Sequence, residues 1–499
     1  MEDIKEIFKL SQDGFPNYRA TFAKIDTVFP INGADKLVRA IICGRDVVIT
    51  KDLPTDALYV YIPIESSLSH KYLSSNNLYR ISESTYALND NFDEVNKLLE
   101  EGHCYEDLAK EYGGLFEKNG RVKQIKIRGV FSQGYIADIE SLKKAYPVLE
   151  QYTDEDFACL EGVSFDIIGD DIFCEKYLVG GKKLVENKVN DQKHYTKRQK
   201  DLRKASSLVP GQFKYHYDTK HFEDAYKDFE PDDEVTISVK FHGSSGIFGN
   251  IKCYKRKEDC NILQRLFYWL YKPREYRLIY ASRTKIRNEN VYNETPNRNY
   301  FYGQDIWGPV RDLIEPYVPK NMIVYGEIVG YVEGTTQMIQ SGHDYGCKPG
   351  EWKFMPYRIV QIQRRNKRLE WDLDEVACWT DTITKILKEK GEYAAANKLI
   401  TVPIIYKGKL RNLYPDLPDP EQLGCYWHIY LLDRMKRDDV FLGMEAREPL
   451  CKMNVPREGV VIRKINDITP RAWKLKSALH QDLEKKAHDK GEHDMEEES

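Results

Sequence analysis

Lys240 stands near the end of a short apolar strand pattern, residues 235–241 (VTISVKF), and it is followed by Gly243, Ser244 and Ser245. A lysine in a desolvated place loses its charge more readily than its ordinary pKa of about 10.4 suggests, and a neutral amine is a nucleophile. Gly243 lets the backbone turn close to a ligand, while the two serines offer hydroxyls and backbone amides. The pattern predicts a nucleophilic lysine, although a solvated lysine at a strand end has the same local sequence.

Cations and carboxylates follow Lys240 along the chain, as the attack of a lysine on a nucleotide phosphate requires. Developing phosphate charge needs cations, and a ribose or a metal ion needs carboxylates. Arg283 ends a predicted strand in residues 252–287, which hold eleven Lys or Arg and three Asp or Glu. Glu327 and Glu458 each lie in or beside apolar strand sequence. Because an unpaired charge is costly there, we expect each carboxylate to meet a ligand, a metal ion or a lysine.

Aromatic and basic residues complete the set. Residues 352–360 (WKFMPYRIV) offer Phe354 and Tyr357 as faces for a base, although aromatic residues on an apolar strand also pack in cores. The pattern does not choose between the two rings. Lys474 and Lys476 are two residues apart, so the alternation of a strand places both on one face. There they would bind phosphate or meet solvent.

The order and content of these groups resemble the covalent nucleotidyltransferase superfamily of polynucleotide ligases and capping enzymes, over about residues 234–480. The resemblance implies a lysyl-nucleotide intermediate, with ATP and Mg²⁺ or Mn²⁺ as cofactors and the metal held by Glu327 and Glu458. It implies catalytic roles for Lys240, His242, Arg283, Lys474 and Lys476. It implies nucleotide binding by Lys240, Gly243, Ser244, Ser245, Arg283, Glu327, Phe354, Tyr357, Glu458, Lys474 and Lys476.

One position narrows the resemblance to RNA ligases. DNA ligases and capping enzymes usually carry KxDG, whereas His242 takes the aspartate position here. The KxHG form is similar to that of phage-type and cellular RNA ligases, and it implies that His242 supports strand joining more than lysine loading. Residues 29–36 and 128–134 look like the OB-type module in front of one bacterial and phage branch of these enzymes. Such modules bind nucleic acid through basic and aromatic strand residues.

These resemblances imply an α+β fold. An N-terminal OB-like β-barrel would be followed by an ATP-grasp-like ligase nucleotidyltransferase domain of antiparallel sheets with flanking helices. Periodicity also predicts strands at 18–31 and 36–50 and a helix at 93–112. The expected parts are an OB-like nucleic-acid-binding module, a partly basic connector, an adenylation domain with one helical insertion, and a charged tail: residues 1–150, 151–225, 226–484 with about 372–439, and 485–499.

Composition limits the classes of protein that need consideration. The formal net charge of −4 gives no global attraction to nucleic acid, so any basic surface is local, as at residues 182–204 with nine Lys or Arg and three Asp or Glu. No apolar run reaches the roughly 20 residues that cross a bilayer, and residues 1–10 do not resemble a signal peptide. Ten cysteines without a CxxC pair indicate reduced thiols. We expect a cytoplasmic monomer without a membrane partner.

The expected function is an ATP-dependent RNA ligase that seals 5′-phosphate and 3′-hydroxyl ends of nicked or broken RNA, with or without a template, in RNA repair. Two alternatives remain at this point. An mRNA capping guanylyltransferase shares the lysine chemistry but uses GTP, and it commonly carries its OB domain after the lysine. A non-catalytic protein that binds RNA ends would need neither Lys240 nor Glu458, yet both are present.

Overall fold

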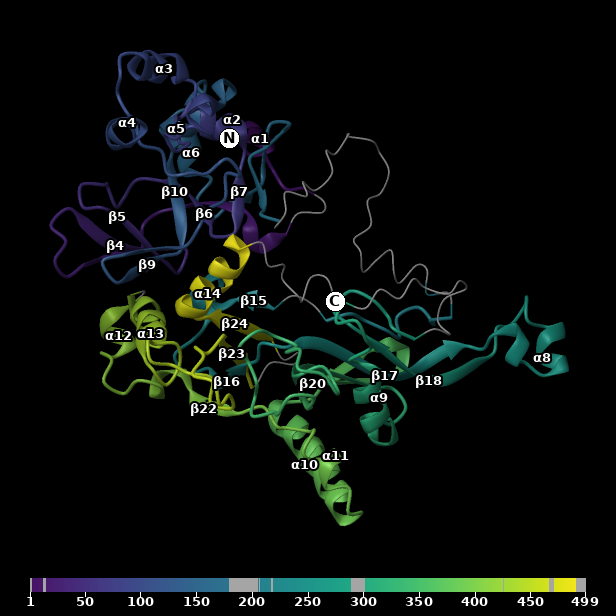
Figure 1. Cartoon of the computed structure of the whole chain (residues 1–499). Coiled ribbons are helices and arrows are strands. Elements are labelled where there is room, and N and C mark those ends of the chain that lie inside the picture. Colours follow the sequence, from purple (N-terminus) through teal and green to yellow (C-terminus); the bar gives the residue numbers. More distant parts are fainter. Residues whose placement is uncertain are drawn as a thin grey trace. The chain divides into compact units, whose positions relative to one another are not determined.

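The computed structural model describes residues 2–11, 15–178, 205, 207–216, 219–288, 301–424, 426–465 and 471–490 (Figure 1). The predicted basic stretch at 182–204 and residues 491–499 of the predicted tail lie outside the described residues. The described residues form two compact units, the first from Met1–His194 with Gln481–Glu492 and the second from Tyr195–His480. Both units mix helices with mostly antiparallel sheets, which confirms the predicted α+β class.

The first unit contains several small antiparallel sheets, of which the four-stranded β10-β6-β2-β11 and the three-stranded β3-β4-β5 and β1-β12-β13 are the largest described. Its strands are β1 (Phe8–Lys9), β2 (Ala20–Ala23), β3 (Thr27–Pro30), β4 (Leu37–Ile42), β5 (Arg45–Thr50), β6 (Tyr59–Pro63), β7 (Ser66–Leu68), β8 (Ile125–Ile127), β9 (Val130–Ser132), β10 (Gly134–Asp138), β11 (Ser164–Phe165), β12 (Ile167–Ile168), β13 (Asp171–Ile172) and β14 (Cys174–Lys176). Its helices are α1 (Glu2–Ile7), α2 (His70–Ser75), α3 (Phe92–Glu100), α4 (Tyr105–Tyr112), α5 (Ile139–Ala145) and α6 (Asp154–Ala158).

Three local features of this unit differ from the sequence-based expectation. The predicted strand 36–50 is a hairpin of β4 and β5, because Cys43 and Gly44 both take positive φ and close a tight turn. The predicted helix 93–112 is divided into α3 and α4 at Gly102, whose φ is +97°. Residues 151–178, expected to begin a connector, form α6 and four strands that pair with β1, β2 and β7 or with each other.

Two five-stranded sheets organise the second unit. The sheet that we call the β16 sheet has the order β15 (Lys220–His221), β24 (Ala472–Lys476), β23 (Gly459–Lys464), β16 (Glu234–Lys240) and β22 (Ile404–Lys409). The β17 sheet has the order β18 (Arg274–Ala281), β17 (Ser244–Tyr254), β19 (Met322–Gly330), β20 (Trp352–Ile362) and β21 (Arg368–Glu370). Because β16 ends at Lys240 and β17 begins at Ser244, the chain passes directly from one sheet into the other at the predicted nucleophile.

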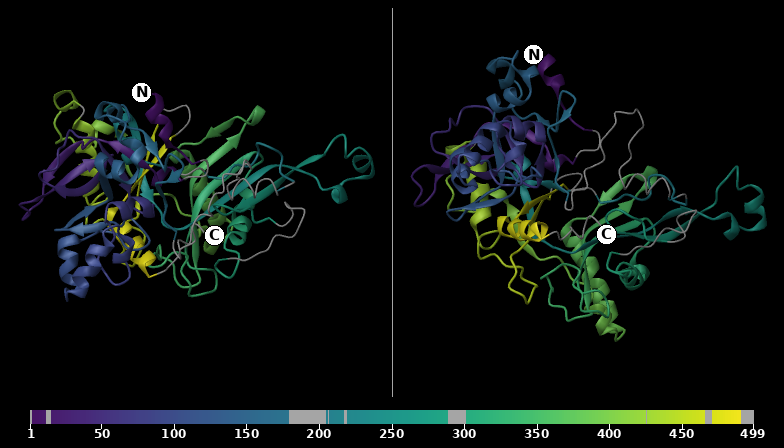
Figure 2. Two further views of the ribbon diagram at one scale, coloured as in Figure 1. Left: turned by 90° about the horizontal axis from the view of Figure 1, so that it is seen from above. Right: turned by 45° about the horizontal axis from the view of Figure 1, so that its top comes forward.

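Helices cover one face of the β17 sheet. Phe248 and Phe354 on that face pack in one core with Trp307 and with α9 (Gly308–Ile314) and α10 (Leu373–Glu389) (Figures 1 and 2). Asp372 begins α10 with a capping box to Glu375. The remaining helices are α8 (Ile262–Leu266), α11 (Tyr393–Ala396), α12 (Pro420–Leu423), α13 (Tyr426–Arg437) and α14 (Ala478–Asp489), whose first turn belongs to this unit.

The predicted helical insertion at 372–439 is not wholly helical. It contains β22, which pairs with β16 along residues 404–409 and extends the β16 sheet on one side. The nine cysteines that the structure describes are free thiols. Among the described helices, none is long and apolar enough to span a bilayer.

Gly459 of β23 lies so close to the backbone of β24 that we expect this position not to tolerate a side chain. A Cβ atom there would lie 2.4 Å from the Leu475 carbonyl oxygen and 3.2 Å from the Lys476 Cα. We expect Gly459→Ala to lower the free energy of unfolding by about 1–3 kcal/mol, because backbone must move to relieve the overlap. The matched control is Gly249→Ala on β17, where the nearest atom is the movable Ile323 Cγ1 at 3.1 Å. A melting temperature of Gly459→Ala equal to or above that of Gly249→Ala would contradict this.

Candidate nucleotidyl-transfer site

Strand register brings the predicted nucleophile and two later motifs into one row. Lys240 of β16 pairs with Gly459 of β23, and Gly459 pairs on its other side with Lys476 of β24. Directly paired residues of antiparallel strands project to the same face of a sheet. The two lysines therefore flank a glycine on one face, and Glu458 directly precedes that glycine.

Lys240 donates a hydrogen bond to Glu458, with 2.6 Å between Nζ and Oε1. The Glu458 side chain is 3% exposed and that of Lys240 20% exposed. Lys476 Nζ lies 3.9 Å from the same carboxylate oxygen. A carboxylate removed from water to this extent needs compensating charge, which these two amines supply. The expectation that Glu458 meets a lysine is thus met by Lys240, from a position 218 residues away in the chain.

His242 lies on the other side of the same carboxylate, with Nδ1 3.8 Å from Glu458 Oε2. Its backbone N–H donates to the hydroxyl of the buried Tyr345 at 2.7 Å. Its ring packs edge-on against His343 and His480, with centroid distances of 4.9 and 4.8 Å. Sequence analysis missed both of these histidines, because neither lies in a recognisable motif.

Burial, followed by the charge of the neighbouring His242, lowers the pKa of His343 to about 4. His343 is therefore neutral near pH 7 and can lie against His242 without charge repulsion. Glu448 is a second buried acid in this region, 3% exposed, and burial raises its pKa to about 7. The site thus holds two buried groups whose pKa values are displaced in the directions that keep them uncharged.

The face of the β16 sheet that carries Lys240 is polar along its length. Ser238, Val461 and Lys474 form the next row of that face, and Thr236, Arg463 and Ala472 the row after it. Arg463 donates from NH1 to Ser238 Oγ at 3.1 Å. The opposite face of β16 is apolar and buried. Arg463 was missed, although its spacing from Gly459 by a multiple of two could have revealed it.

Strands of the β17 sheet carry further polar groups, at the place where the chain passes from the β16 sheet into the β17 sheet. Glu327 on β19 lies directly opposite Ser245. The hydroxyls of Ser244 and Ser245 are buried and make no hydrogen bond within the described part of the chain. Gly243 is needed for close approach, since a Cβ there would lie 2.6 Å from the Ile328 carbonyl oxygen.

Arg283 lies in a turn just beyond β18, closed by a hydrogen bond from Ser282 N to Lys285 O at 2.9 Å. Because Ala281 pairs with Ile247, this turn lies at the end of the β17 sheet where β17 begins. Arg283 therefore belongs to the same end of that sheet as Ser244. Arg287, four residues later, is buried with its guanidinium 4.3 Å from the centre of the Trp307 ring.

The two candidate aromatic residues have different environments. Phe354 is fully buried, and its ring packs edge-on against Phe248 at 5.2 Å between centroids. In this structure it packs as a core residue, one of the two roles that its sequence left open. Tyr357 is only partly buried, and its carbonyl oxygen accepts a hydrogen bond from Arg463 at 3.4 Å. Tyr357 is therefore beside the polar face of the β16 sheet.

A comparison with known protein families gives a match over the region that contains these residues. Residues 233–476 match the family model described as RNA ligase, a range that begins just before β16 and ends with β24. This part of the chain is thus similar to the RNA ligase family. The match spans both sheets and includes every predicted site residue, from Lys240 to Lys476, which confirms the resemblance found in the sequence.

Solved structures similar to the whole chain include RNA ligase from Naegleria gruberi. One, a variant with ATP and Mn, is 16% identical with a TM-score of 0.46, and the match covers 93% of this chain and 98% of the other. Another, with PPi, is 17% identical with a TM-score of 0.46, covering 94% and 98%. These scores are too low to support a functional argument. No curated protein matches the sequence.

Two carboxylates could hold a divalent cation at this site. In the parts of the chain that the structure describes, no group of three or more His, Cys, Asp or Glu side chains is arranged to hold a metal ion. A magnesium ion that accompanies a nucleotide needs only one or two carboxylates, because phosphates and water supply its other oxygen ligands. Glu327 and Glu458 would be the carboxylates that hold a metal ion of this kind.

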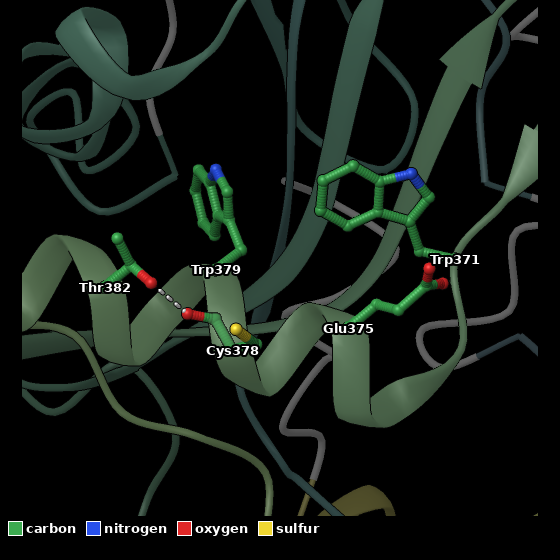
Figure 3. A pocket seen from close by; sticks show the side chains of 5 residues that line it. All are labelled: Trp371, Glu375, Cys378, Trp379 and Thr382. Carbon is green, nitrogen blue, oxygen red and sulfur yellow. Dashed lines mark hydrogen bonds between the residues drawn. The ribbon is translucent and has the colours of Figure 1, made fainter.

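A shallow hollow of about 330 Å³ lies on α10, and it is not this site. Figure 3 shows that Trp371 and Trp379 stand on either side of it, with Cys378 between them on the helix. The Trp379 ring N–H donates to the Tyr317 carbonyl oxygen at 3.3 Å. The hollow contains neither a cation nor any predicted site residue, so it offers nothing to bind the phosphates of a nucleotide.

The pKa of Glu448 predicts a pH dependence of stability. Because the folded chain binds this proton more tightly than the unfolded chain, the contribution is fully present below about pH 4.5 and is lost as pH rises through about 7. Replacement by Gln removes the ionisation, so Glu448→Gln should gain up to about 3 kcal/mol relative to wild type between about pH 5 and pH 8. Melting temperatures at the two pH values test this, with the exposed Glu445→Gln as control. A difference between variant and wild type that does not change with pH would contradict it.

Proposed function

We propose that this protein is an ATP-dependent RNA ligase that loads AMP onto Lys240 and joins a 5′-phosphate end to a 3′-hydroxyl end. The observation that carries the proposal is the pairing of Lys240 with Glu458 at 2.6 Å inside an RNA ligase domain, with Lys476 in the same strand row. A solvated lysine at a strand end would not be expected to pair with a carboxylate that is only 3% exposed.

In the first step, Lys240 Nζ forms a bond to the α-phosphorus of ATP, and the bond from that phosphorus to the bridging oxygen breaks. Pyrophosphate leaves with the electron pair. The amine must give up a proton before its lone pair can attack. Glu458 accepts the hydrogen bond from this amine, so its carboxylate is the proton acceptor within reach.

The positions of the other site residues indicate how each would bind the nucleotide. Lys474 and Lys476 lie on the same face as Lys240 and would neutralise phosphate charge, together with Arg283 at the start of the β17 sheet. The buried hydroxyls of Ser244 and Ser245 suit phosphate or ribose oxygens. Tyr357 would stack on the adenine. A magnesium or manganese ion bound with the nucleotide by Glu327 and Glu458 would supply further neutralisation of the phosphates.

In the second step, AMP passes from Lys240 to the 5′-phosphate of an RNA end, and the bond from lysine nitrogen to phosphorus breaks. In the third step, the 3′-hydroxyl oxygen of the other end attacks that 5′-phosphate, AMP leaves, and the strand is joined. We assign His242 to these later steps. Its ring lies against Glu458 Oε2 and two further histidines, whereas Lys240 contacts Oε1.

The first unit is proposed to bind the RNA as an OB-like module. The β8–β9 hairpin and its turn expose Lys126 and Arg128, and Lys126 Nζ lies 4.9 Å from the centre of the Phe131 ring. Exposed basic side chains of this kind suit the phosphates of an RNA backbone. The proposed substrate is a nicked or broken RNA, joined by a cytoplasmic monomer in RNA repair.

Replacing Lys240 by Ala should abolish labelling of the protein by α-labelled ATP and strand joining, because no other group replaces the amine. The matched control is Lys464→Ala on β23. Lys464 is also 20% exposed, and its amine pairs with Asp233 at 2.6 Å. It should keep both activities. Label on the Lys240→Ala variant overturns the lysyl-AMP step. Labelling of wild type by GTP alone indicates a capping enzyme, and no labelling by either nucleotide indicates a binding protein.

His242→Ala should separate the steps. We expect lysine labelling within a few-fold of wild type and joining reduced by about 100-fold or more, the usual contribution of a group that moves or holds a proton. The measurement is the yield of labelled protein against the yield of sealed RNA from the same preparation. An equal loss in both yields would place His242 in lysine loading instead.

A further inference from the structure

Strands β17 and β18 continue as a hairpin beyond the body of the second unit and end in a small helical tip, residues 255–273, that contains α8. Figure 1 and both views of Figure 2 show α8 at the far end of this hairpin, away from α9 and α10. The tip is therefore the outermost part of this unit along β17.

Seven large apolar side chains of the tip are between 57% and 82% exposed. They are Ile262, Leu263, Leu266, Phe267, Trp269, Leu270 and Tyr271. Single exposed apolar residues are ordinary on protein surfaces, but a contiguous group of this size marks a contact surface. Seven such residues within ten consecutive positions require an explanation that the ligase chemistry does not supply.

Hydrogen bonds within the tip fix its local fold. Arg265 donates from Nε to the Lys257 carbonyl oxygen at 3.0 Å, and Tyr268 donates from its hydroxyl to the Lys255 carbonyl oxygen at 2.6 Å. Gln264 completes a capping box with Asn261 at the start of α8. The tip is thus an ordered element whose seven apolar side chains remain exposed.

Positive charge surrounds the base of this apolar tip. Residues 255–274 contain six Lys or Arg and two Asp or Glu. Both acids are paired with Arg256, at 3.3 Å for Glu258 and 3.1 Å for Asp259. Lys257, Lys272 and Arg274 are exposed. The tip thus combines an exposed apolar surface with basic residues at its base. We call Lys257, Lys272 and Arg274 the cationic collar.

We propose that this tip inserts into the surface of a membrane that contains anionic phospholipid. Apolar side chains enter the boundary between headgroups and acyl chains, and Trp and Tyr favour that depth because they have both apolar and polar parts. The cationic collar then lies at the level of the headgroups and complements their negative charge. This mode of binding lies on the membrane and requires no spanning helix.

Other occupants fit these observations less well. Four of the seven side chains are aliphatic and have no ring face on which a base could stack, which disfavours single-stranded RNA. A second copy of the chain would bury one side of a projecting tip and leave the others in water. A fluid membrane surface can surround the whole tip and contact each of its exposed apolar side chains.

The test is sedimentation of the full chain with vesicles of phosphatidylcholine alone or mixed with phosphatidylserine. We expect binding to the mixed vesicles, weakened by salt, and at least a tenfold lower partition into phosphatidylcholine alone. The triple variant Phe267→Ser, Trp269→Ser and Leu270→Ser should lose about 100-fold or more in partition. The charge variant Lys257→Glu with Lys272→Glu should lose the preference for phosphatidylserine.

The matched control replaces three apolar residues of similar exposure elsewhere, Leu115→Ser, Tyr393→Ser and Val440→Ser, and it should bind as wild type does. Unchanged melting temperatures show that each variant is folded. Wild type that remains in solution with the mixed vesicles overturns the proposal. So does a tip variant that binds vesicles as wild type does, a self-association of wild type that the tip variant loses without any vesicle binding, or single-stranded RNA binding that the tip variant alone loses.

Discussion

The buried carboxylate of Glu458 is the constraint around which the ligase domain is arranged. A carboxylate that is 3% exposed is stable only if cations replace the water it has lost, and Lys240 and Lys476 approach it from the strands on either side. The residue between them in this row is Gly459, where a Cβ atom would lie 2.4 Å from the Leu475 carbonyl oxygen, so a glycine is needed for β23 and β24 to pair this closely. The strand pairing that stabilises the β16 sheet therefore also brings both amines to the carboxylate.

This arrangement also bears on the proton of the Lys240 amine. The Lys240 amine donates to the Glu458 carboxylate at 2.6 Å, and the proposed attack requires that this amine first give up a proton. Other titratable groups lie in the same region: His242 Nδ1 is 3.8 Å from the other carboxylate oxygen, and burial lowers the pKa of His343 and raises that of Glu448. Removal of water strengthens each of these interactions, so small displacements on nucleotide binding would have large electrostatic consequences.

The β17 strand links the two ends of the second unit. It begins at Ser244, four residues after β16 ends at Lys240, and it ends at Tyr254, where the projecting tip starts. The proposed membrane contact and the proposed chemistry therefore lie at opposite ends of one continuous strand. β19 pairs with residues 244–250 of this strand and β18 with residues 247–254, so the tip follows directly from the sheet that carries Glu327.

The sequence by itself determined the chemical groups and their local settings. Lys240 at a strand end, two carboxylates in apolar surroundings, and Lys474 and Lys476 on one face all follow from composition and from the two-residue period of a strand. Only the tertiary structure decided which groups meet. The contact of Lys240 with Glu458, the burial of Phe354 against Phe248, and the meeting of His242 with His343 and His480 depend on strand register and packing between distant segments. Register is a property of paired strands, and a one-residue shift would reverse every side chain, so no local pattern contains it.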